Sequence, residues 1–206
     1  MMILRSSSSS PFARKVRIAV HLLGLAGEIR IENTDTMDPK DSVRRQNPLG
    51  KIPVLMLEDG TALYDSRVIV EFLDGVSPIS RLIPEDKRDR LAVRRWEALA
   101  DGVLDAGLLV RYESLRDKKE QSKAWVDKQL ARMHRAMAQM ESELGERPWC
   151  HGERYSLADI AVGCCLGWVD FRRPADIDWR AEHANLVRFY ERLMERAAFA
   201  DTAPKA

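Results

Sequence analysis

Over the first 75 residues, hydrophobic and polar positions alternate between the periods of strands and of helices. Short apolar runs or alternating residues indicate strands in Met2–Leu4, Glu28–Glu32, Ile52–Leu57 and Thr61–Leu63. Helices are predicted over Ala13–Leu25, Lys40–Gln46 and Asp65–Leu73. Asp59 and Gly60 supply a hairpin turn signal between the last two strands. The resulting order, β-α-β-α-β-β-α, is the layout of an α/β thioredoxin-like domain.

Beyond residue 75 the pattern predicts only helices. Residues 76–86 have little periodicity and contain two prolines, so we interpret them as a linker. Four helices are expected after it, over Lys87–Arg116, Trp125–Leu144, Ser156–Phe171 and Asn185–Arg196. In the second of these, apolar residues recur every three or four positions in one stripe that predicts core packing: Val126, Leu130, Met133, Met137, Met140 and Leu144. We therefore predict a thioredoxin-like domain over 1–75 and an all-α helical bundle over 87–206.

Composition narrows the classes of function. The chain has 206 residues, of which 33 are Lys or Arg and 32 are Asp or Glu, so its net charge is +1. Without a basic surplus, nucleic acid is not expected as a partner. No apolar run approaches the roughly 18 residues of a membrane span, and the N-terminus lacks a secretion signal. Cys150, Cys164 and Cys165 are too few for a disulfide framework, so we expect reduced thiols and a cytoplasmic protein.

A run of five serines, Ser6 to Ser10, lies between the first predicted strand and the first predicted helix. One interpretation is structural, because Ser10 followed by Pro11 is a favourable helix start. The other is chemical, since a helix N-terminus stabilises a nearby thiolate. Redox proteins of this layout place a Cys-x-x-Cys motif here, whereas this chain has Ser10-Pro11-Phe12-Ala13. The thiol would then come from a ligand, and Ser10 would donate a hydrogen bond to its sulfur.

Four motifs resemble those of the cytosolic glutathione S-transferases, in particular serine-type bacterial members that include an uncharacterised enterobacterial group. In chain order they are Ser10-Pro11-Phe12-Ala13-Arg14-Lys15-Val16, Asn47-Pro48-Leu49-Gly50-Lys51-Ile52-Pro53, Leu63-Tyr64-Asp65-Ser66-Arg67 and Ser156-Leu157-Ala158-Asp159. The resemblance covers essentially the whole chain. It implies that glutathione is a substrate and that the protein is a homodimer with its site near the interface.

The resemblance also implies roles for individual residues. Pro53 would follow a cis peptide bond that turns the Ile52 backbone towards the cysteinyl part of glutathione. Ser66, at a helix start, would hold the γ-glutamyl carboxylate, while Asp65 would pair with the ammonium group or orient the site. Lys51 would meet the glycyl carboxylate, although a lone lysine is also typical of a solvated surface. Ser10 aligns with the catalytic serine, and Ser9 or Ser8 remains an alternative.

The pocket for the electrophilic acceptor is expected between the two halves. Its candidate lining is Phe12, the segment Asp101–Arg111, Trp168 and Phe171, although a lone tryptophan is also typical of a core. Three arginines are candidates for binding an anionic acceptor: Arg111, Arg172 and Arg173. The alternative for them is a solvated surface, or pairing with Asp105 or Asp170.

Three functions fit this pattern. A glutathione transferase, which conjugates the glutathione thiolate to a small electrophile and so serves detoxification, is the first. A glutathione-dependent thiol oxidoreductase is disfavoured by Ser10, and a glutathione-binding protein with little catalysis is the third. The four histidines lack metal-ligand spacing, so no metal is expected. Ser156 with Asp159 forms a Ser-x-x-Asp helix cap, which we assign to folding.

Overall fold

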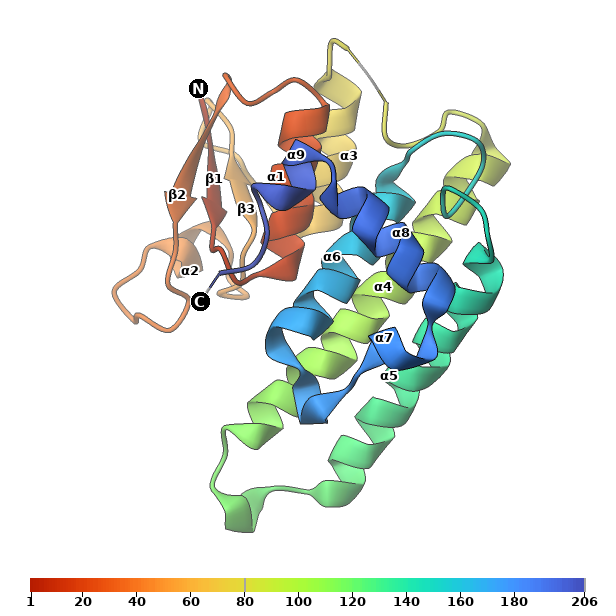
Figure 1. Ribbon diagram of the computed structural model, residues 1–206. Coiled ribbons are helices and arrows are strands. Elements are labelled where there is room, and N and C mark those ends of the chain that lie inside the picture. Colours follow the sequence, from red (N-terminus) through yellow and green to blue (C-terminus); the bar gives the residue numbers. More distant parts are fainter. Residues whose placement is uncertain (80, 206) are drawn as a thin grey trace. The chain divides into compact units, whose positions relative to one another are not determined.

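The computed structural model describes residues 1–79 and 81–205, which form two compact units. Unit 1 comprises Met1–Glu85 together with Arg196–Ala206, and unit 2 comprises Asp86–Glu195. The ribbon diagram colours both along the sequence (Figure 1). The α/β thioredoxin-like arrangement followed by an all-helical part, which the sequence predicts, is confirmed.

Unit 1 is built on a four-stranded mixed sheet. Its strands are β1 (Met2–Ser6), β2 (Ile29–Asn33), β3 (Val54–Met56) and β4 (Ala62–Leu63). They lie in the order β2-β1-β3-β4, with β1 parallel to β2 and β3 antiparallel to both of its neighbours. The alternating segment Glu28–Glu32 matches β2, where Ile29 is buried and Ile31 is exposed.

The helices of unit 1 are α1 (Pro11–Leu22), α2 (Val43–Gln46), α3 (Ser66–Val76) and α9 (Ala197–Ala200). Helices α1 and α3 pack on each other and on the sheet, whereas α2 lies against β3 (Figure 1). The core between them contains Leu4, Val16, Leu55 and Ile69, all fully buried. This packing fixes the directions in which α1 and α3 leave the sheet.

The limits of unit 1 differ from the predicted domain boundary at two places. Leu82 and Ile83, predicted as part of a linker, are held to α3 because the buried Asp74 carboxylate accepts hydrogen bonds from their backbone N–H groups. The last residues, predicted as part of the helical domain, belong to unit 1. There the Arg14 guanidinium donates a hydrogen bond of 2.9 Å to the Phe199 carbonyl. Both differences arise from side-chain contacts that local sequence pattern does not encode.

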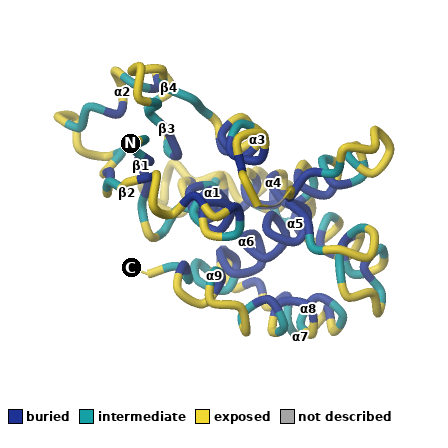
Figure 2. The backbone as a smooth tube through the Cα atoms, turned by 90° about the horizontal axis from the view of Figure 1, so that it is seen from above, coloured by how far each residue is buried: buried dark blue, intermediate teal, exposed yellow. Residues whose placement is uncertain are grey.

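Unit 2 is entirely helical. Its elements are α4 (Lys87–Ser114), η1 (Lys118–Glu120), α5 (Lys123–Leu144), α6 (Leu157–Arg172), η2 (Pro174–Asp176), α7 (Trp179–Glu182) and α8 (Ala184–Met194). Helix α4 packs along both α5 and α6. Every residue of α6 from Leu157 to Val169 is buried, and its tube is dark blue over this length in Figure 2. The predicted stripe on α5 is buried at Met133, Met137, Met140 and Leu144.

Glycine permits a close approach between α4 and α6. A Cβ atom added to Gly107 on α4 would lie 2.6 Å from Cζ3 of Trp168 on α6, which no real contact allows. The indole therefore occupies the space that a side chain at residue 107 would need. This contact sets the register of the two helices and buries Trp168 to 1% exposure.

Candidate functional site

Strand directions bring the predicted site residues of unit 1 to one edge of its sheet. Arg5 near the end of β1 pairs with Val54 at the start of antiparallel β3, and Leu63 at the end of β4 pairs with Leu55. The segment after β1 that leads to Ser10, the residues before β3, and the segment after β4 that leads to Ser66 therefore all leave the sheet at this edge. The topology alone gathers the start of α1, the Ile52–Pro53 bond and the start of α3.

The N-terminus of α1 is capped by Ser10 and carries no acidic residue in its first turn. The Ser10 Oγ accepts a hydrogen bond of 3.2 Å from the Ala13 N–H, and Pro11 occupies the first helical position, as the sequence predicts. A hydroxyl can accept and donate at the same time, so the Ser10 hydrogen is still available for a ligand. The free N–H groups of this turn favour negative charge nearby.

The other serines of the run are placed differently. The Ser8 Oγ donates to the Lys205 carbonyl at 3.2 Å, which engages its hydrogen within unit 1. Ser6 ends β1, and its buried Oγ makes no hydrogen bond. Within this run, Ser10 alone is the N-cap of α1. This placement favours Ser10 over Ser8 as the partner of a sulfur atom.

The loop before β3 contains a cis peptide bond between Ile52 and Pro53, which confirms the predicted geometry of this bond. Buried Asn47 fixes the loop with its side-chain amide. Its Nδ2 donates to the Lys51 carbonyl at 2.8 Å, and its Oδ1 accepts from the Leu49 N–H at 3.0 Å. Asn47 therefore holds both arms of the loop that presents the Ile52 backbone.

A buried arginine, which the sequence analysis missed, ties α2 to the sheet. Arg5 donates to Thr34 at 2.8 Å, to Ser42 at 2.8 Å and to the Asp41 carboxylate at 2.7 Å. Hydrogen bonding to the Val43 N–H, together with the Arg5 charge, lowers the pKa of Asp41. Because α2 leads directly into the Asn47 loop, Arg5 positions that loop. The available signal was an arginine directly after the apolar residues at the start of β1.

The start of α3 is capped by Asp65, whose Oδ1 accepts from the Arg67 N–H at 2.9 Å. Ser66 is the first helical residue and is 2% exposed, whereas Asp65 and Lys51 are exposed. The peptide bond between Tyr64 and Asp65 is cis, which no sequence signal indicated. A second helix N-terminus therefore lies at the same sheet edge, where the Asp65 carboxylate caps the Arg67 N–H.

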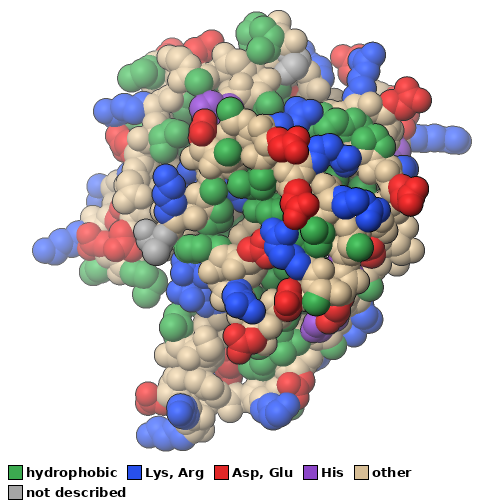
Figure 3. Space-filling model, in the orientation of Figure 1, with side chains coloured by type: hydrophobic (Ala, Val, Ile, Leu, Met, Phe, Trp, Pro, Cys, Tyr) green, Lys and Arg blue, Asp and Glu red, His purple; other side chains and the backbone are tan. Residues whose placement is uncertain are grey.

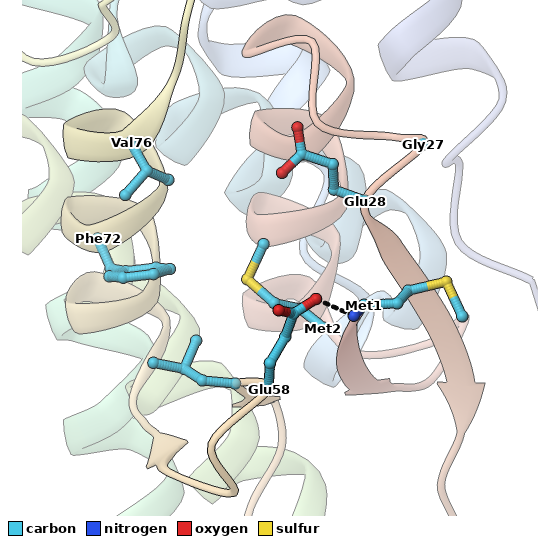
Figure 4. A pocket seen from close by; sticks show the side chains of 8 residues that line it. Met1, Met2, Gly27, Glu28, Glu58, Phe72 and Val76 are labelled. Carbon is cyan, nitrogen blue, oxygen red and sulfur yellow. Dashed lines mark hydrogen bonds and ion pairs between the residues drawn. The ribbon is translucent and has the colours of Figure 1, made fainter.

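The pocket in Figure 4 lies at the opposite end of the sheet. It has a volume of about 530 Å³ and is lined by Met1, Met2, Gly27, Glu28, Leu57, Glu58, Phe72 and Val76. The Met1 ammonium group pairs with Glu58 within it. Val76 ends α3, whereas Ser66 begins it. This pocket is consequently not part of the site built on Ser10, Ile52 and Ser66.

The predicted acceptor residues are divided between the two units. Phe12 is half-buried on α1, with the Lys15 ammonium 5.9 Å from its ring centroid. In unit 2, Arg111 lies in the last turn of α4 and is half-buried. Trp168, in contrast, belongs to the core against Gly107 and Met133, which corrects its predicted role as a lining residue.

Charge on the molecular surface has no single sign. On the face drawn in Figure 3, Lys and Arg side chains are interspersed with Asp and Glu. No helix in the described part of the chain is long and apolar enough to cross a membrane. Within residues 1–79 and 81–205, no group of three or more His, Cys, Asp or Glu side chains is arranged to hold a metal ion.

Both parts of the chain match domains of one known protein family. Residues 9–76 match the model of the glutathione S-transferase N-terminal domain, and residues 123–192 match that of the C-terminal domain. Over 203 residues the chain is 35% identical to the uncharacterized GST-like protein YibF of Escherichia coli K12, and the match covers 98% of each.

Solved structures with the same fold are also similar in sequence. A glutathione S-transferase from Methylobacillus flagellatus with glutathione bound is 46% identical, with a TM-score of 0.96 over 100% of both chains. A glutathione transferase family member from Pseudomonas fluorescens Pf-5 with bound S-(propanoic acid)-glutathione is 35% identical, with a TM-score of 0.88, again over 100% of both chains.

Proposed function

Since the chain belongs to the glutathione S-transferase family, we propose that it conjugates the glutathione thiolate to a small electrophile. The observation that carries the proposal is the N-terminus of α1, which is free of acidic residues, capped by half-buried Ser10, and on the same sheet edge as Ile52–Pro53 and Ser66. Glutathione bound in similar structures supports this use of the edge.

The residues of unit 1 take distinct roles in binding. The Ile52 backbone pairs with the cysteinyl part of glutathione, and Ser66 with the α3 N-terminus receives the γ-glutamyl carboxylate. Asp65 pairs with the ammonium group. Exposed Lys51 meets the glycyl carboxylate. Asn47 and Arg5 touch no ligand and act as positioning residues.

In the reaction, the glutathione thiol loses its proton to solvent, and the α1 N-terminus with the Ser10 hydroxyl stabilises the thiolate. The sulfur then forms a bond to the electrophilic carbon. In a substitution, the leaving group departs with the electron pair of its former bond. In an addition to a polarised double bond, the π electron pair of that double bond moves to the neighbouring carbon, which takes a proton from water.

The oxidoreductase alternative conflicts with the state of the cysteines. None of the three takes part in a disulfide bond, and all three are fully buried. Burial is the largest cause that raises the pKa of Cys150 and of Cys165, which suppresses the thiolate form that exchange needs. Because reduced thiols are typical of the cytoplasm, we also propose that compartment.

We further propose a homodimer. Val68, Phe72 and Val76 recur at four-residue spacing on α3, where Val68 and Val76 remain 47% and 48% exposed. Such a stripe is suited to burial against a second copy. Light scattering should give twice the chain mass, and a monomeric mass would contradict this part of the proposal.

The conjugation proposal is tested with glutathione and a nitroaryl chloride, whose thioether product absorbs light. We expect turnover that depends on both reactants and saturates with glutathione. Calorimetry should give a glutathione dissociation constant in the same assay buffer. Binding without turnover on any electrophile tested would instead favour a binding protein, and a mixed disulfide detected by mass spectrometry would favour the oxidoreductase.

A further inference from the structure

The side chain of Arg5 leaves the sheet of unit 1 on the face opposite to Leu4. Successive side chains of a strand point to opposite faces, and Leu4 belongs to the core between the sheet, α1 and α3. Arg5 therefore points towards the other face, where its guanidinium contacts α2 and the segment before it. The residue is only 7% exposed. A charge at such depth is costly unless it is paired, so the partners of Arg5 fix where its guanidinium lies.

The contacts of Arg5 reach both ends of α2, which lies near the end of β1 (Figure 1). Nη2 donates to the Asp41 carboxylate at 2.7 Å, and Nη1 donates to the Ser42 hydroxyl at 2.8 Å and to Gln46 Oε1 at 3.3 Å. Asp41 and Ser42 precede the helix, whereas Gln46 is its last residue. A single helical turn is not stable by itself. Arg5 therefore holds α2 in place, and we call Arg5, Asp41, Ser42 and Gln46 the Arg5 clamp.

The clamp is continuous with the segment that carries Lys51. Asn47 follows α2 directly, and its backbone N–H donates to the Val43 carbonyl at 2.7 Å. The side-chain Nδ2 of Asn47 donates to the Lys51 carbonyl at 2.8 Å. The backbone of Lys51 is thus tied to α2 through Asn47, and α2 is tied to the sheet through Arg5. A displacement of α2 would move Lys51 with it.

The residues that hold the other parts of glutathione in our proposal are anchored independently of the clamp. Val54, two residues after Ile52, pairs with Arg5 in the antiparallel ladder of β1 and β3. That pairing uses main-chain atoms and does not depend on the side chain at residue 5. Ser66 lies at the start of α3, which packs on α1. A substitution of Arg5 should consequently displace Lys51 and leave Ile52 and Ser66 in place.

We propose that the Arg5 clamp positions Lys51 and so gives the protein its preference for a ligand that carries the glycyl carboxylate. This inference rests on the proposed binding of glutathione. Lys51 is exposed, and an exposed ion pair is weak largely because two flexible side chains must be held in one geometry. A backbone that is already fixed reduces this entropic loss. Arg5 touches no ligand and is a positioning residue, since its contribution passes through Lys51.

The test compares glutathione with its glycyl amide, in which a carboxamide replaces only the glycyl carboxylate. Dissociation constants of both are measured by calorimetry on the full chain without an electrophile, and their ratio gives the preference. The variants are Arg5→Met, Arg5→Lys and Lys51→Gln. Arg30→Met is the matched control, because the Arg30 side chain lies on the adjacent strand β2, is 55% exposed and pairs with Glu32 on the same strand.

We expect the wild type to bind glutathione at least about fivefold more tightly than the amide, which is the upper range of an exposed ion pair. Arg5→Met should reduce this preference to less than about twofold, because Lys51 loses its fixed position. Arg5→Lys keeps a charge opposite Asp41 but not the planar set of donors, so it should retain part of the preference. Arg30→Met should retain all of it. Equal binding of both ligands by the wild type would overturn the proposal.

A second variant separates positioning from folding. Arg5→Met alone leaves the Asp41 carboxylate without its cation, which destabilises the fold. In the double variant Arg5→Met/Asp41→Asn, the amide oxygen still accepts from the Val43 N–H, as the carboxylate does at 2.8 Å. Thermal unfolding of this variant should be close to that of the wild type, whereas its preference should be lost. A preference restored by Asp41→Asn would refute the clamp, because the unpaired carboxylate would then be the cause.

The combination Arg5→Met/Lys51→Gln tests whether Arg5 acts through Lys51. Lys51→Gln should remove the preference by itself, and Arg5→Met should then change it by less than about twofold further. If Arg5→Met weakened the binding of both ligands equally, in either background, its effect would be a general loss of structure, which contradicts the proposal.

Turnover with a nitroaryl chloride distinguishes this inference from the proposed conjugation. In Arg5→Met the KM for glutathione should rise by about the factor lost in binding, while kcat changes less than about twofold. A preference that Arg5→Met abolishes, without turnover of any electrophile by the wild type, would support the clamp and refute the conjugation. Turnover together with a preference that Arg5→Met leaves unchanged would refute the clamp alone.

Discussion

The helices α1 and α6 both begin after a serine, yet their N-termini are completed in opposite ways. At α6, buried Ser156 forms a capping box with Asp159, which is fully buried. The Asp159 carboxylate accepts from the Cys150 N–H at 2.8 Å and from the Ser156 N–H at 2.7 Å. At α1, Ser10 is half-buried, and the first turn contains no acid.

The difference separates a structural helix start from one that can bind a ligand. At α6, the Asp159 carboxylate accepts from the buried N–H groups and supplies the negative charge that a helix N-terminus favours. Burial is the largest influence on the pKa of Asp159 and raises it. At α1 the same preference is left for a group from outside. Removing the internal carboxylate at α6 should therefore lower stability, whereas adding a carboxylate at α1 should lower activity.

The largest effect is expected for Asp159→Ala. The substitution leaves the buried N–H groups of Cys150 and Ser156 without their acceptor, at a cost of about 1–3 kcal/mol for each. The free energy of unfolding from urea titration should therefore fall by about 2–6 kcal/mol. Glu153→Ala, at an exposed position shortly before α6, is the control and should change it by less than about 0.5 kcal/mol. Equal losses in both variants would contradict the structural assignment.

A negative charge at the start of α1 should strongly reduce activity while the helix stays capped. Asp and Asn are comparable N-caps, so Ser10→Asp and Ser10→Asn should be similarly stable. Only the Asp variant repels the thiolate, and we expect its kcat/KM to fall about a hundredfold, or roughly 2.7 kcal/mol. The assay is conjugation under identical conditions, with thermal unfolding as the check on folding. Equal activity of the two variants would show that the thiolate does not approach this turn.

Removal of the Ser10 hydroxyl tests the hydrogen bond alone. Ser10→Ala should lower kcat/KM for glutathione conjugation at least about tenfold, or roughly 1.4 kcal/mol, since the thiolate loses a donor. The loss of the cap should also lower stability by about 0.5–2 kcal/mol. Ser8→Ala removes a hydroxyl that donates to Lys205 and should retain activity. If steady-state kinetics instead gave the larger loss of kcat/KM for Ser8→Ala, Ser8 would be the residue that donates to the sulfur.

The smallest effect on the free energy of unfolding is expected for Glu143, an acid near the surface, in contrast to buried Asp159. Hydrogen bonding to Arg95 lowers the pKa of Glu143 from 4.5 to about 2. Because the pKa is lowered in the folded state, ionised Glu143 contributes to folding stability above about pH 4.5, the unfolded value. This contribution is lost as the pH falls towards 2. Arg95 is 58% exposed, so Glu143→Gln should cost only about 0.5 kcal/mol at pH 7 and progressively less from pH 4.5 to 2. A cost independent of pH in urea unfolding, with Glu146→Gln as the exposed control, would contradict an ionic origin.

Much of the fold and part of the site follow from short sequence patterns. The element order up to α3, the caps at Ser10 and Ser156, the cis bond before Pro53 and the buried end of the α5 stripe were all predicted correctly. Each of these depends on neighbours within a few residues or on a motif shared with a known family. The short helices α7 and α9 were missed, since four residues carry too little periodicity to detect.

The misplaced features depend on partners far along the chain. Trp168 was a candidate lining residue with a core position as its alternative, and its close approach to Gly107, 61 residues earlier, places it in the core. Arg5 had no assigned role because its partners begin at Glu32 and extend to Gln46. The tail after Glu195 was assigned to the helical part, since nothing local indicates its hydrogen bond with Arg14.

The sequence by itself therefore determined the family, the order of strands and helices up to α3 and the helix cap at the start of α1, because helix caps and strand periods are local properties of a chain. The tertiary structure alone decided which charges are neutralised. Asp170 turns to Arg180 rather than to Arg172, and Glu113 turns to Arg116 rather than to Arg111. An ion pair is chosen by distances of a few ångströms between side chains, and packing sets those distances.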